Sequence, residues 1–499
     1  MKKESLITVS VLMLSVAQML FVIIARPQLH AIAQQSSSSK DSSQSNRPKV
    51  VEGTWQGTLE TGGAKLRLAF EITKSPDGTL TGNLDSLDQG AMDIPINSIV
   101  LKDTNLRLEI KIIGGVYEGT LDEEGTTIVG HWEQGGVKLP LTFRRSSGAL
   151  SAPNRPQEPK KPYPFDEQEV SYENKKAGVR LDGTLTLPRT RGLHPAVLLI
   201  NGSGAQDRNE TVAGHRPFLV LADHLTRRGI AVLRVDDRGL KGSQDDFYKA
   251  TDEDFASDVL AGVEFLKTRK EINPKQIGLI GHSEGGVIAP MAAVESNDVA
   301  FIVLMAAPAL PGDQFLHLQT ASLMKASGAS DENISQVRAL QERMFTILKQ
   351  EKTDTKAGER LRAEVSGMLA RMTDEQKLAL GLTEAAMENQ FKVMMTRWYR
   401  YIIAYDPRPA LMKVKVPVLA INGKRDLQVP AKENLSAIAQ ALRAGGNKDH
   451  TVVELPGLNH LFQTSQSGLP AEYAQIEETM SPAALQMIVD WVLKRTPKR

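Results

Sequence analysis

A serine stands between two glycines in the segment GHSEG at 281–285, after an apolar run and before a run of small apolar residues. This setting predicts a strand, a sharp turn and a helix, the context in which Gly-x-Ser-x-Gly presents a nucleophilic serine. The turn strains the backbone at Ser283, and glycine at 281 and 285 omits the Cβ atoms that would collide there. The pattern alone is common, so the prediction that Ser283 is a nucleophile requires a base and an acid further along the chain.

The base is sought among the histidines that follow Ser283. A serine hydroxyl is hardly ionised near neutral pH, so a histidine must accept its proton during attack. His460 follows the apolar segment 451–455, in a loop at the carboxyl end of a predicted strand. Of the other two downstream histidines, His317 precedes a helical stretch and His450 leads into a strand. We therefore predict that His460 is the general base.

The acid must lie between Ser283 and His460 in the order Ser, Asp/Glu, His. Asp426 follows the apolar segment 417–421, and its surroundings Gly-x-x-Asp-x-x-Val-Pro predict a short turn that returns the carboxylate over the sheet. There it would hold the tautomer of His460 and stabilise the imidazolium. Asp313, after the preceding strand, is the alternative acid, and we prefer Asp426.

A developing oxyanion needs two preorganised N–H donors. We predict the backbone of Glu284 as one donor and that of Ser203 as the other, with Gly204 as the alternative to Ser203. The side chain of Glu284 is interpreted as a solvated or helix-capping carboxylate. Three further charged residues either bind substrate or form a buried ion-pair network between two loops: Asp207, Arg208 and Arg238.

Unbroken apolar runs that alternate with helical patterns are typical of a parallel sheet covered by helices on both faces. The predicted strands are 195–200, 230–235, 277–280, 300–305, 417–421 and 451–455, and two of the helices are 218–228 and 254–268. The residues of the proposed triad then share the carboxyl edge of the sheet, where such sheets bind ligands. The segment of about 313–405 has only helical patterns, and we predict a lid there.

The N-terminal part of the chain has a different sequence pattern. Residues 50–146 show period-2 alternation with frequent turn signals, which predicts a small antiparallel sandwich or barrel of about eight strands. Trp55 and Trp132 are expected in its core, on strands that pair to close it. Residues 147–167 read as a Pro-rich linker, and 168–499 as the catalytic domain.

The chain begins with the features of an export signal. Lys2 and Lys3 precede the apolar segment 6–25, and an Ala-x-Ala site predicts cleavage after Ala33. Residues 1–33 are thus expected to be a signal peptide, with an uncleaved anchor as the alternative. A disordered Ser-rich tether is expected at 34–49. We expect a periplasmic or extracellular protein without a stable membrane span after cleavage.

Composition excludes several functions. Lys and Arg number 60 against 59 Asp and Glu, so no basic excess is present to bind nucleic acid. The absence of cysteine excludes disulfides, a thiolate nucleophile and Cys-based metal sites. No cofactor or metal is expected, and the oligomeric state is left open.

From about Gln168 onward the chain resembles the α/β-hydrolase superfamily, and more narrowly exported bacterial serine esterases with a helical lid and an N-terminal β domain. The β domain itself resembles a lipocalin-like domain. The motifs that carry the main resemblance are NGSGAQDRN (201–209), DDRG (236–239), GHSEGG (281–286), WYRY (398–401), YDP (405–407) and NGxxDxxVP (422–430). Asn201 departs from the histidine of many members, and Leu240-Lys241 from a usual Gly-x-Gly.

The resemblance implies hydrolysis of carboxylic esters, usually with short acyl chains, through an acyl-enzyme and without a cofactor. A thioesterase or an aminopeptidase would use the same triad, since the triad does not encode the leaving group. A non-catalytic ligand-binding protein with a degenerate site is the alternative of another class. The presence of Ser283, Asp426 and His460 in order argues against it.

Overall fold

The computed structural model describes residues 51–61, 64–87, 91–134, 137–146, 154–240, 245–370 and 384–497. The predicted signal peptide and tether lie outside these residues. The described residues form two compact units, an antiparallel β domain and a domain with a mostly parallel sheet. Among the described helices, none has the length and apolar character that crossing a bilayer requires.

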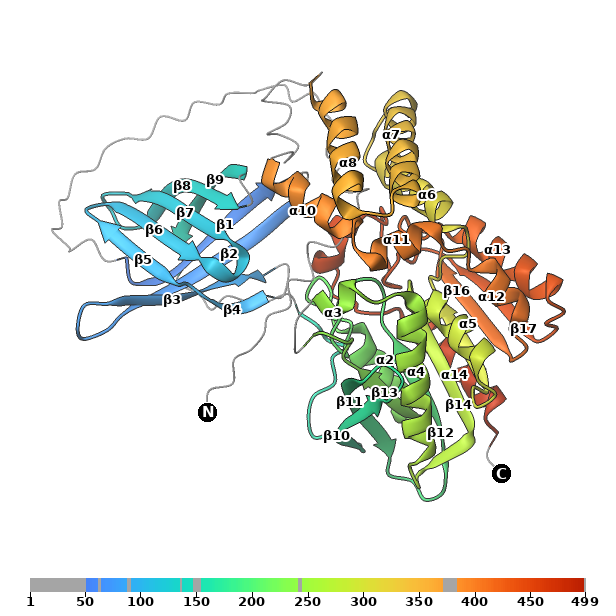
Figure 1. Ribbon diagram of the computed structural model, residues 1–499. Helices are drawn as coiled ribbons and strands as arrows, with labels where there is room; N and C mark the ends of the chain where they lie inside the picture. Colours follow the sequence, from blue (N-terminus) through green and yellow to red (C-terminus); the bar gives the residue numbers. More distant parts are fainter. Residues whose placement is uncertain are drawn as a thin grey trace. The chain divides into compact units, whose positions relative to one another are not determined.

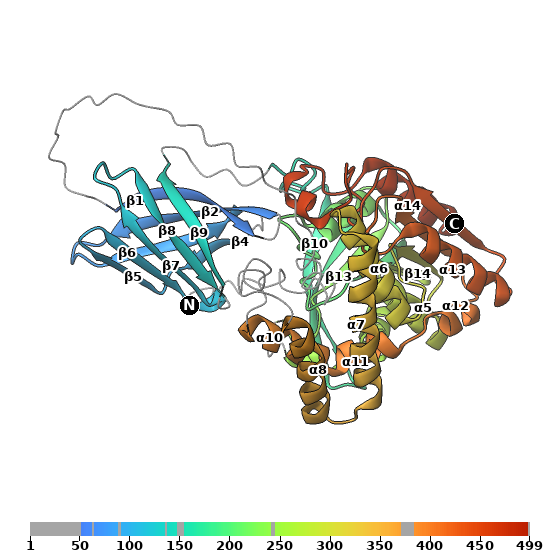
Figure 2. The ribbon, with the colours of Figure 1, turned by 90° about the horizontal axis from the view of Figure 1, so that it is seen from above.

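The β domain is one curved antiparallel sheet, a half-barrel (Figure 2). Its strands are β1 (Gly53–Thr61), β2 (Ala64–Lys74), β3 (Leu80–Ser86), β4 (Ala91–Pro95), β5 (Ser98–Lys102), β6 (Asn105–Ile110), β7 (Gly115–Leu121), β8 (Thr127–Gln134) and β9 (Val137–Arg145). The spatial order is β4-β3-β2-β1-β9-β8-β7-β6-β5, so the described residues contain nine strands where about eight were predicted. The two end strands, β4 and β5, lie next to each other, because only Ile96 and Asn97 connect them; Ile96 N–H donates to Gly82 O of β3 at 3.0 Å and Asn97 N–H to Glu109 O of β6 at 2.8 Å.

The core of this half-barrel is aromatic. Trp55 and Trp132 are both buried, as predicted. Their strands do not pair with each other, because β1 pairs with β9 and β8 lies between β9 and β7. Phe143 contacts Phe70 and Tyr117 in edge-on geometry, with ring centroids 4.6 and 4.9 Å apart. Alternation along each strand thus places one row of large side chains inside the curl.

The second domain is built on an eight-stranded sheet (Figure 1). Its strands are β10 (Phe165–Asn174), β11 (Val179–Pro188), β12 (His194–Ile200), β13 (Ala231–Val235), β14 (Ile272–His282), β15 (Phe301–Met305), β16 (Val418–Gly423) and β17 (His450–Leu455). Their order is β10-β11-β13-β12-β14-β15-β16-β17; β12 to β17 run parallel to one another, and β11 pairs antiparallel with both β10 and β13. All six predicted strands are present. The hairpin β10–β11 was not predicted as strands, and β10 begins at Phe165, inside the predicted linker.

Helices cover both faces of this sheet (Figure 1). One face carries α2 (Pro217–Thr226) and α14 (Pro482–Arg495), whose apolar side chains pack with those of β12, β13, β15 and β16. The other carries α4 (Asp252–Lys267), α5 (Gly285–Glu295), α12 (Arg408–Lys413) and α13 (Ala431–Ala444). A short helix α3 (Asp245–Tyr248) precedes α4. The central strands are buried on both sides, as their unbroken apolar runs predict.

An all-helical insertion separates β15 from β16. It contains α6 (Gly312–Ala326), α7 (Asp331–Gln350), α8 (Asp354–Leu369), α10 (Glu384–Met394) and α11 (Arg397–Ala404). Its two ends are joined, because Gly312 N–H donates to Tyr405 O at 2.8 Å. A Cβ on Gly312 would lie 1.7 Å from Ile402 O, so only glycine permits this approach.

Candidate active site

Ser283 lies at the end of β14, on a sharp turn into α5. Its φ of 52° is in the left-handed region, which residues other than glycine rarely adopt. The N–H of Ser283 donates to Met305 O at 2.8 Å, which holds the turn against β15. The local backbone is therefore the strand, strained turn and helix that the sequence predicts.

The glycines around Ser283 are required by close backbone approaches. A Cβ on Gly281 would lie 2.0 Å from Gly285 O, across the turn. A Cβ on Gly285 would lie 2.2 Å from Ile200 O, on the neighbouring strand β12. The first glycine thus permits the turn itself, and the second permits the start of α5 to pack on the sheet.

Asp426 and His460 form a buried hydrogen-bonded pair at the carboxyl edge of the sheet. His460 Nδ1 lies 2.8 Å from Asp426 Oδ2. Asp426 Oδ1 accepts from the N–H groups of Gln428 and Val429, at 2.9 and 2.8 Å. The carboxylate is fixed by backbone donors, so it imposes a proton on Nδ1 of His460 and leaves Nε2 to accept one.

The loops that carry this pair touch through a glycine. Gly423 ends β16, and a Cβ there would lie 2.2 Å from Leu458 O, in the loop that leads to His460. The amide of Asn422 donates to Val429 O at 2.7 Å and closes the turn around Asp426. The predicted Gly-x-x-Asp-x-x-Val-Pro turn is therefore a compact support for the carboxylate.

The residues considered as alternatives lie in other interactions. Asp313 is on α6, where its Oδ2 accepts from Lys349 Nζ at 2.7 Å. His317 Nδ1 lies 3.1 Å from Gln341 Oε1, and His450 Nδ1 lies 2.9 Å from Asn447 O. The structure brings Asp426, and not Asp313, to His460.

Carboxylates hold the loop that follows β12 at three backbone N–H groups. The bonds are Gly202 N to Glu210 Oε1 at 2.7 Å, Gln206 N to Asp237 Oδ2 at 2.9 Å, and Arg208 N to Asp236 Oδ1 at 2.9 Å. Within the described residues, no protein acceptor is bonded to the N–H of Ser203, Gly204 or Glu284. The loop lies close to Ser283, since a Cβ on Gly202 would be 3.3 Å from Ser283 Cβ.

The side chain of Glu284 is buried, so its interpretation as a solvated or capping carboxylate is wrong. Its Oε1 accepts from Trp398 Nε1 at 2.7 Å, and the side chains of Asp252 and Ser203 lie near the carboxylate. Burial raises the pKa of Glu284, although its interactions with these three side chains oppose the shift. Burial, together with the charge of Glu284, raises the pKa of Asp252 well above its usual range. The raised pKa of Asp252 favours its protonated form beside Glu284.

A second carboxylate, Glu210, joins three loops of the site. Its Oε1 accepts from Gly202 N–H and lies 2.8 Å from His282 Nδ1. His282 Nε2 lies 3.0 Å from His460 O, and the two imidazole centroids are 4.8 Å apart. Glu210 and His282 are both buried.

Of the three charged residues near these loops, Arg208 and Arg238 form ion pairs, whereas Asp207 accepts hydrogen bonds within its own loop. Arg208 bonds Asp236 at 2.7 Å and Glu169 at 2.6 Å. Arg238 bonds Asp258 at 2.6 Å. The carboxylate of Asp207 accepts from the N–H groups of Asn209 and Thr211, both at 3.0 Å, and so closes its own loop.

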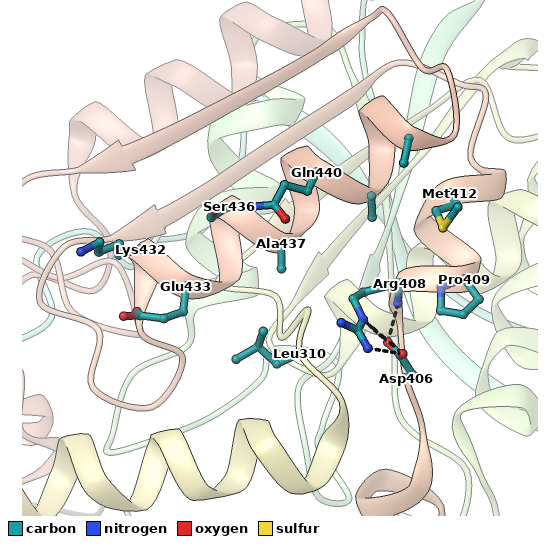
Figure 3. Close-up of a pocket in the computed structure, with 12 residues that line it drawn as sticks. Leu310, Asp406, Arg408, Pro409, Met412, Lys432, Glu433, Ser436, Ala437 and Gln440 are labelled. Atoms are coloured by element: carbon teal, nitrogen blue, oxygen red, sulfur yellow. Dashed lines mark hydrogen bonds and ion pairs between the residues drawn. The ribbon is translucent and has the colours of Figure 1, made fainter.

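A groove of about 720 Å³ lies elsewhere on the same domain, along α12 and α13. Figure 3 shows the Asp406–Arg408 pair on one side of it and α13 on the other. Its described lining residues do not include Ser283, Asp426 or His460. Among the described residues, no group of three His, Asp or Glu side chains is arranged to hold a metal ion.

Several residues of this site were not predicted. Glu210 lies directly after the quoted NGSGAQDRN motif, and His282 lies inside GHSEG. Trp398 stood in a quoted motif without a role. Polar residues within or beside glycine-rich loops were the only sequence signal for Glu210 and His282. Their partners could not be predicted, because long-range packing determines them.

The chain is similar to a known protein family and to several known proteins. The model of the "Alpha/beta hydrolase family" matches residues 197–475. Esterase EstD of Thermotoga maritima is 24% identical over 334 residues, which span 67% of this chain and 69% of that protein. Among solved structures, the α/β hydrolase GrgF from a Penicillium species is 16% identical with a TM-score of 0.43, over 66% of this chain and 99% of that one. Est1E from Butyrivibrio proteoclasticus is 16% identical with a TM-score of 0.38, over the same shares. The matched region contains the strained serine turn and the Asp426–His460 pair, and the chain belongs to the alpha/beta hydrolase family.

Proposed function

We propose that the protein is a serine esterase that cleaves carboxylic esters through an acyl-enzyme formed on Ser283. The observation that carries this proposal is the buried Asp426–His460 pair on the same sheet edge as Ser283, whose backbone is strained. The match to an esterase over two thirds of both chains supports the ester as the substrate class.

The proposed mechanism follows from these groups. As Ser283 Oγ attacks the ester carbonyl, His460 Nε2 takes its proton, and Asp426 stabilises the imidazolium. The N–H groups of Ser203 and Glu284 receive the oxyanion, with Gly204 as the alternative to Ser203. His460 then returns the proton to the leaving alkoxide, and the alcohol departs. A water molecule, activated by His460, cleaves the acyl-enzyme and releases the carboxylic acid.

The test is covalent labelling of the purified protein with a fluorophosphonate probe. We expect labelling of the wild type, loss of labelling in Ser283→Ala, and full labelling in the control Ser436→Ala, which alters an exposed serine of α13. No labelling of the wild type, or equal labelling of Ser283→Ala, would overturn the proposal.

The acyl group and leaving group are tested separately. We propose short acyl chains, so p-nitrophenyl acetate and butyrate should be cleaved with higher kcat/KM than the octanoate. Acyl-CoA and aminoacyl anilides tested in parallel identify a thioesterase or an aminopeptidase if either is the better substrate.

We also propose export and a lid. The N-terminal Lys2, Lys3 and apolar segment 6–25 support export, and N-terminal sequencing of the mature protein should begin at Gln34. The bond between Trp398 of α11 and Glu284 supports a lid role for the helical insertion.

A further inference from the structure

We propose that Glu210 and His282 are positioning residues of the esterase reaction. In this proposal His282 is held as an imidazolium that fixes the oxyanion loop, the nucleophile turn and the backbone of the general base at once. The effect of these residues on the reaction rate rests on the proposed function, whereas the charge state of His282 does not.

The protonation follows from the partners of the ring. His282 Nε2 faces a backbone carbonyl, that of His460, which can only accept. His282 Nδ1 faces a carboxylate oxygen of Glu210. That oxygen accepts from Gly202 N–H as well, so an ionised Glu210 satisfies both donors. Each ring nitrogen therefore carries a proton, and a buried imidazolium is balanced by a buried carboxylate.

The surroundings agree with this charge state. Burial alone would lower the pKa of His282, but the charge and hydrogen bond of Glu210, the His460 carbonyl and the charge of Asp426 together raise it. The charged or titratable groups that face the pair come from three loops. Asp426 follows β16, the ring of His460 follows β17, and Asp237, which is electrostatically coupled to Glu210, follows β13.

Glu210 and His282 hold three parts of the proposed catalytic site in position: the oxyanion loop, the serine turn and the backbone of the general base. Glu210 holds Gly202, next to the predicted oxyanion donor Ser203. His282 directly precedes Ser283. The hydrogen bond from His282 Nε2 to His460 O fixes the position of the His460 backbone relative to Ser283. When the imidazolium loses a proton, one of its two bonds must lose its donor, and the alignment of donor, nucleophile and base is relaxed.

The pH dependence has a defined sign. A raised pKa means that the imidazolium persists through neutral pH and is lost as the pH increases. Removal of the carboxylate charge in Glu210→Gln lowers that pKa. Glutamine preserves the shape, and its amide oxygen can still accept from Gly202 N–H without the carboxylate charge, so the variant separates charge from packing.

The experiment uses the full chain and four variants: Glu210→Gln, Glu210→Ala, His282→Gln and the control His215→Gln. His215 is a buried histidine outside the site, bonded to Thr479 and Tyr473 O, and burial lowers its pKa to about 4. The rate constant of fluorophosphonate labelling is measured from pH 6 to 10 and normalised to folded protein. The nitrogen resonances of ¹⁵N-histidine protein, assigned with His282→Gln, report the protonation of the ring.

We expect both nitrogens of His282 to be protonated at pH 7.5 in the wild type, and one nitrogen to lose its proton in Glu210→Gln. Labelling of Glu210→Gln should be at least tenfold slower at pH 7.5, with its alkaline decline at lower pH than in the wild type. The KM for p-nitrophenyl acetate should change less than twofold. His215→Gln should lose stability but retain the wild-type pH profile.

Two results would overturn the inference. One is a neutral His282 in the wild type at pH 7.5, and the other is a folded Glu210→Gln protein with the wild-type labelling rate and pH profile. The second result includes the case of a folded Glu210→Ala protein that labels at the wild-type rate. If the wild type does not label at all, the proposed function is wrong. The nitrogen resonances then still show whether His282 is an imidazolium.

Discussion

The indole N–H of Trp398 donates to the carboxylate of Glu284 at 2.7 Å, deep inside the domain. Trp398 is on α11, the last helix of the insertion, and Glu284 directly follows Ser283. The helical insertion is thereby hydrogen-bonded to the residue whose backbone is the proposed oxyanion donor.

Replacement of Trp398 by phenylalanine should therefore leave a buried carboxylate with one donor fewer. A hydrogen bond to a charged group contributes about 1.5 to 3 kcal/mol. We expect Trp398→Phe to lower the free energy of unfolding by that amount beyond the loss in Trp491→Phe, measured by urea denaturation. Trp491 is the matched control, because it is also buried but its Nε1 bonds to no acceptor among the described residues. Equal losses in the two variants would contradict the role of the bond.

Asp426→Asn should lower kcat by about four orders of magnitude, because the amide would favour the wrong tautomer of His460. Asp313→Asn changes the same kind of side chain on α6, away from His460, and should keep kcat within about twofold. Steady-state kinetics with p-nitrophenyl acetate measures both. If the large loss appears in Asp313→Asn, the assignment of the acid is wrong.

The Asp252–Glu284 pair predicts a pH-dependent stability. The folded pKa of Asp252 is raised, so the folded state binds more protons than the unfolded state above the usual aspartate pKa of about 3.9. Its contribution is complete below that value and is lost as the pH rises through the folded pKa. Asp252→Asn should remove this dependence, so its melting temperature relative to that of the wild type should increase between pH 5 and 8.

Asp313 provides the opposite sign for comparison. Partial burial would raise its pKa, but the hydrogen bond and charge of Lys349 outweigh this and lower it. Asp313→Asn should therefore lose stability at neutral pH and match the wild type in acid. A relative melting temperature of Asp252→Asn that falls with pH would show that Asp252 is ionised in the folded protein.

Gly281→Ala should disrupt the nucleophile turn, since the added Cβ would lie 2.0 Å from Gly285 O. Overpacking of this kind costs about 1 to 3 kcal/mol, and we expect the upper end because both partners are backbone. Gly367→Ala on α8 is the control, with no atom within 4 Å of the new Cβ. It should stabilise the protein by up to about 1 kcal/mol. Chemical denaturation monitors both, and a Gly281→Ala protein as stable as the wild type would show that the turn can open.

The sequence predicted the elements that have simple patterns. The strand before Ser283 and the strands before Asp426 and His460 are unbroken apolar runs, and burial on both faces leaves no other pattern for them. Chain order and the carboxyl-edge rule then brought Asp426 and His460 to one place.

The sequence did not predict the features that depend on long-range packing. Strand β10 has mostly exposed and half-buried positions, and five prolines just before it indicated a linker. Glu284 is polar at the start of a helix, which usually indicates solvent or a cap, but it is buried and bonded to Trp398, 114 residues further along the chain. Glu210 was passed over for a similar reason, because its partner His282 lies 72 residues further along.

Because its two ends are hydrogen-bonded to each other, the helical insertion is a module that can be exchanged as a whole. β15 and β16 are adjacent hydrogen-bonded strands. The Gly312–Tyr405 bond brings the start and the end of the insertion together, so the insertion connects to the sheet at a single neck. A helical segment of another length could be recombined at this neck without a change in sheet order or in the loops that carry Asp426 and His460. Substrate preference could then evolve by replacement of a whole module while the hydrolytic groups stay in place.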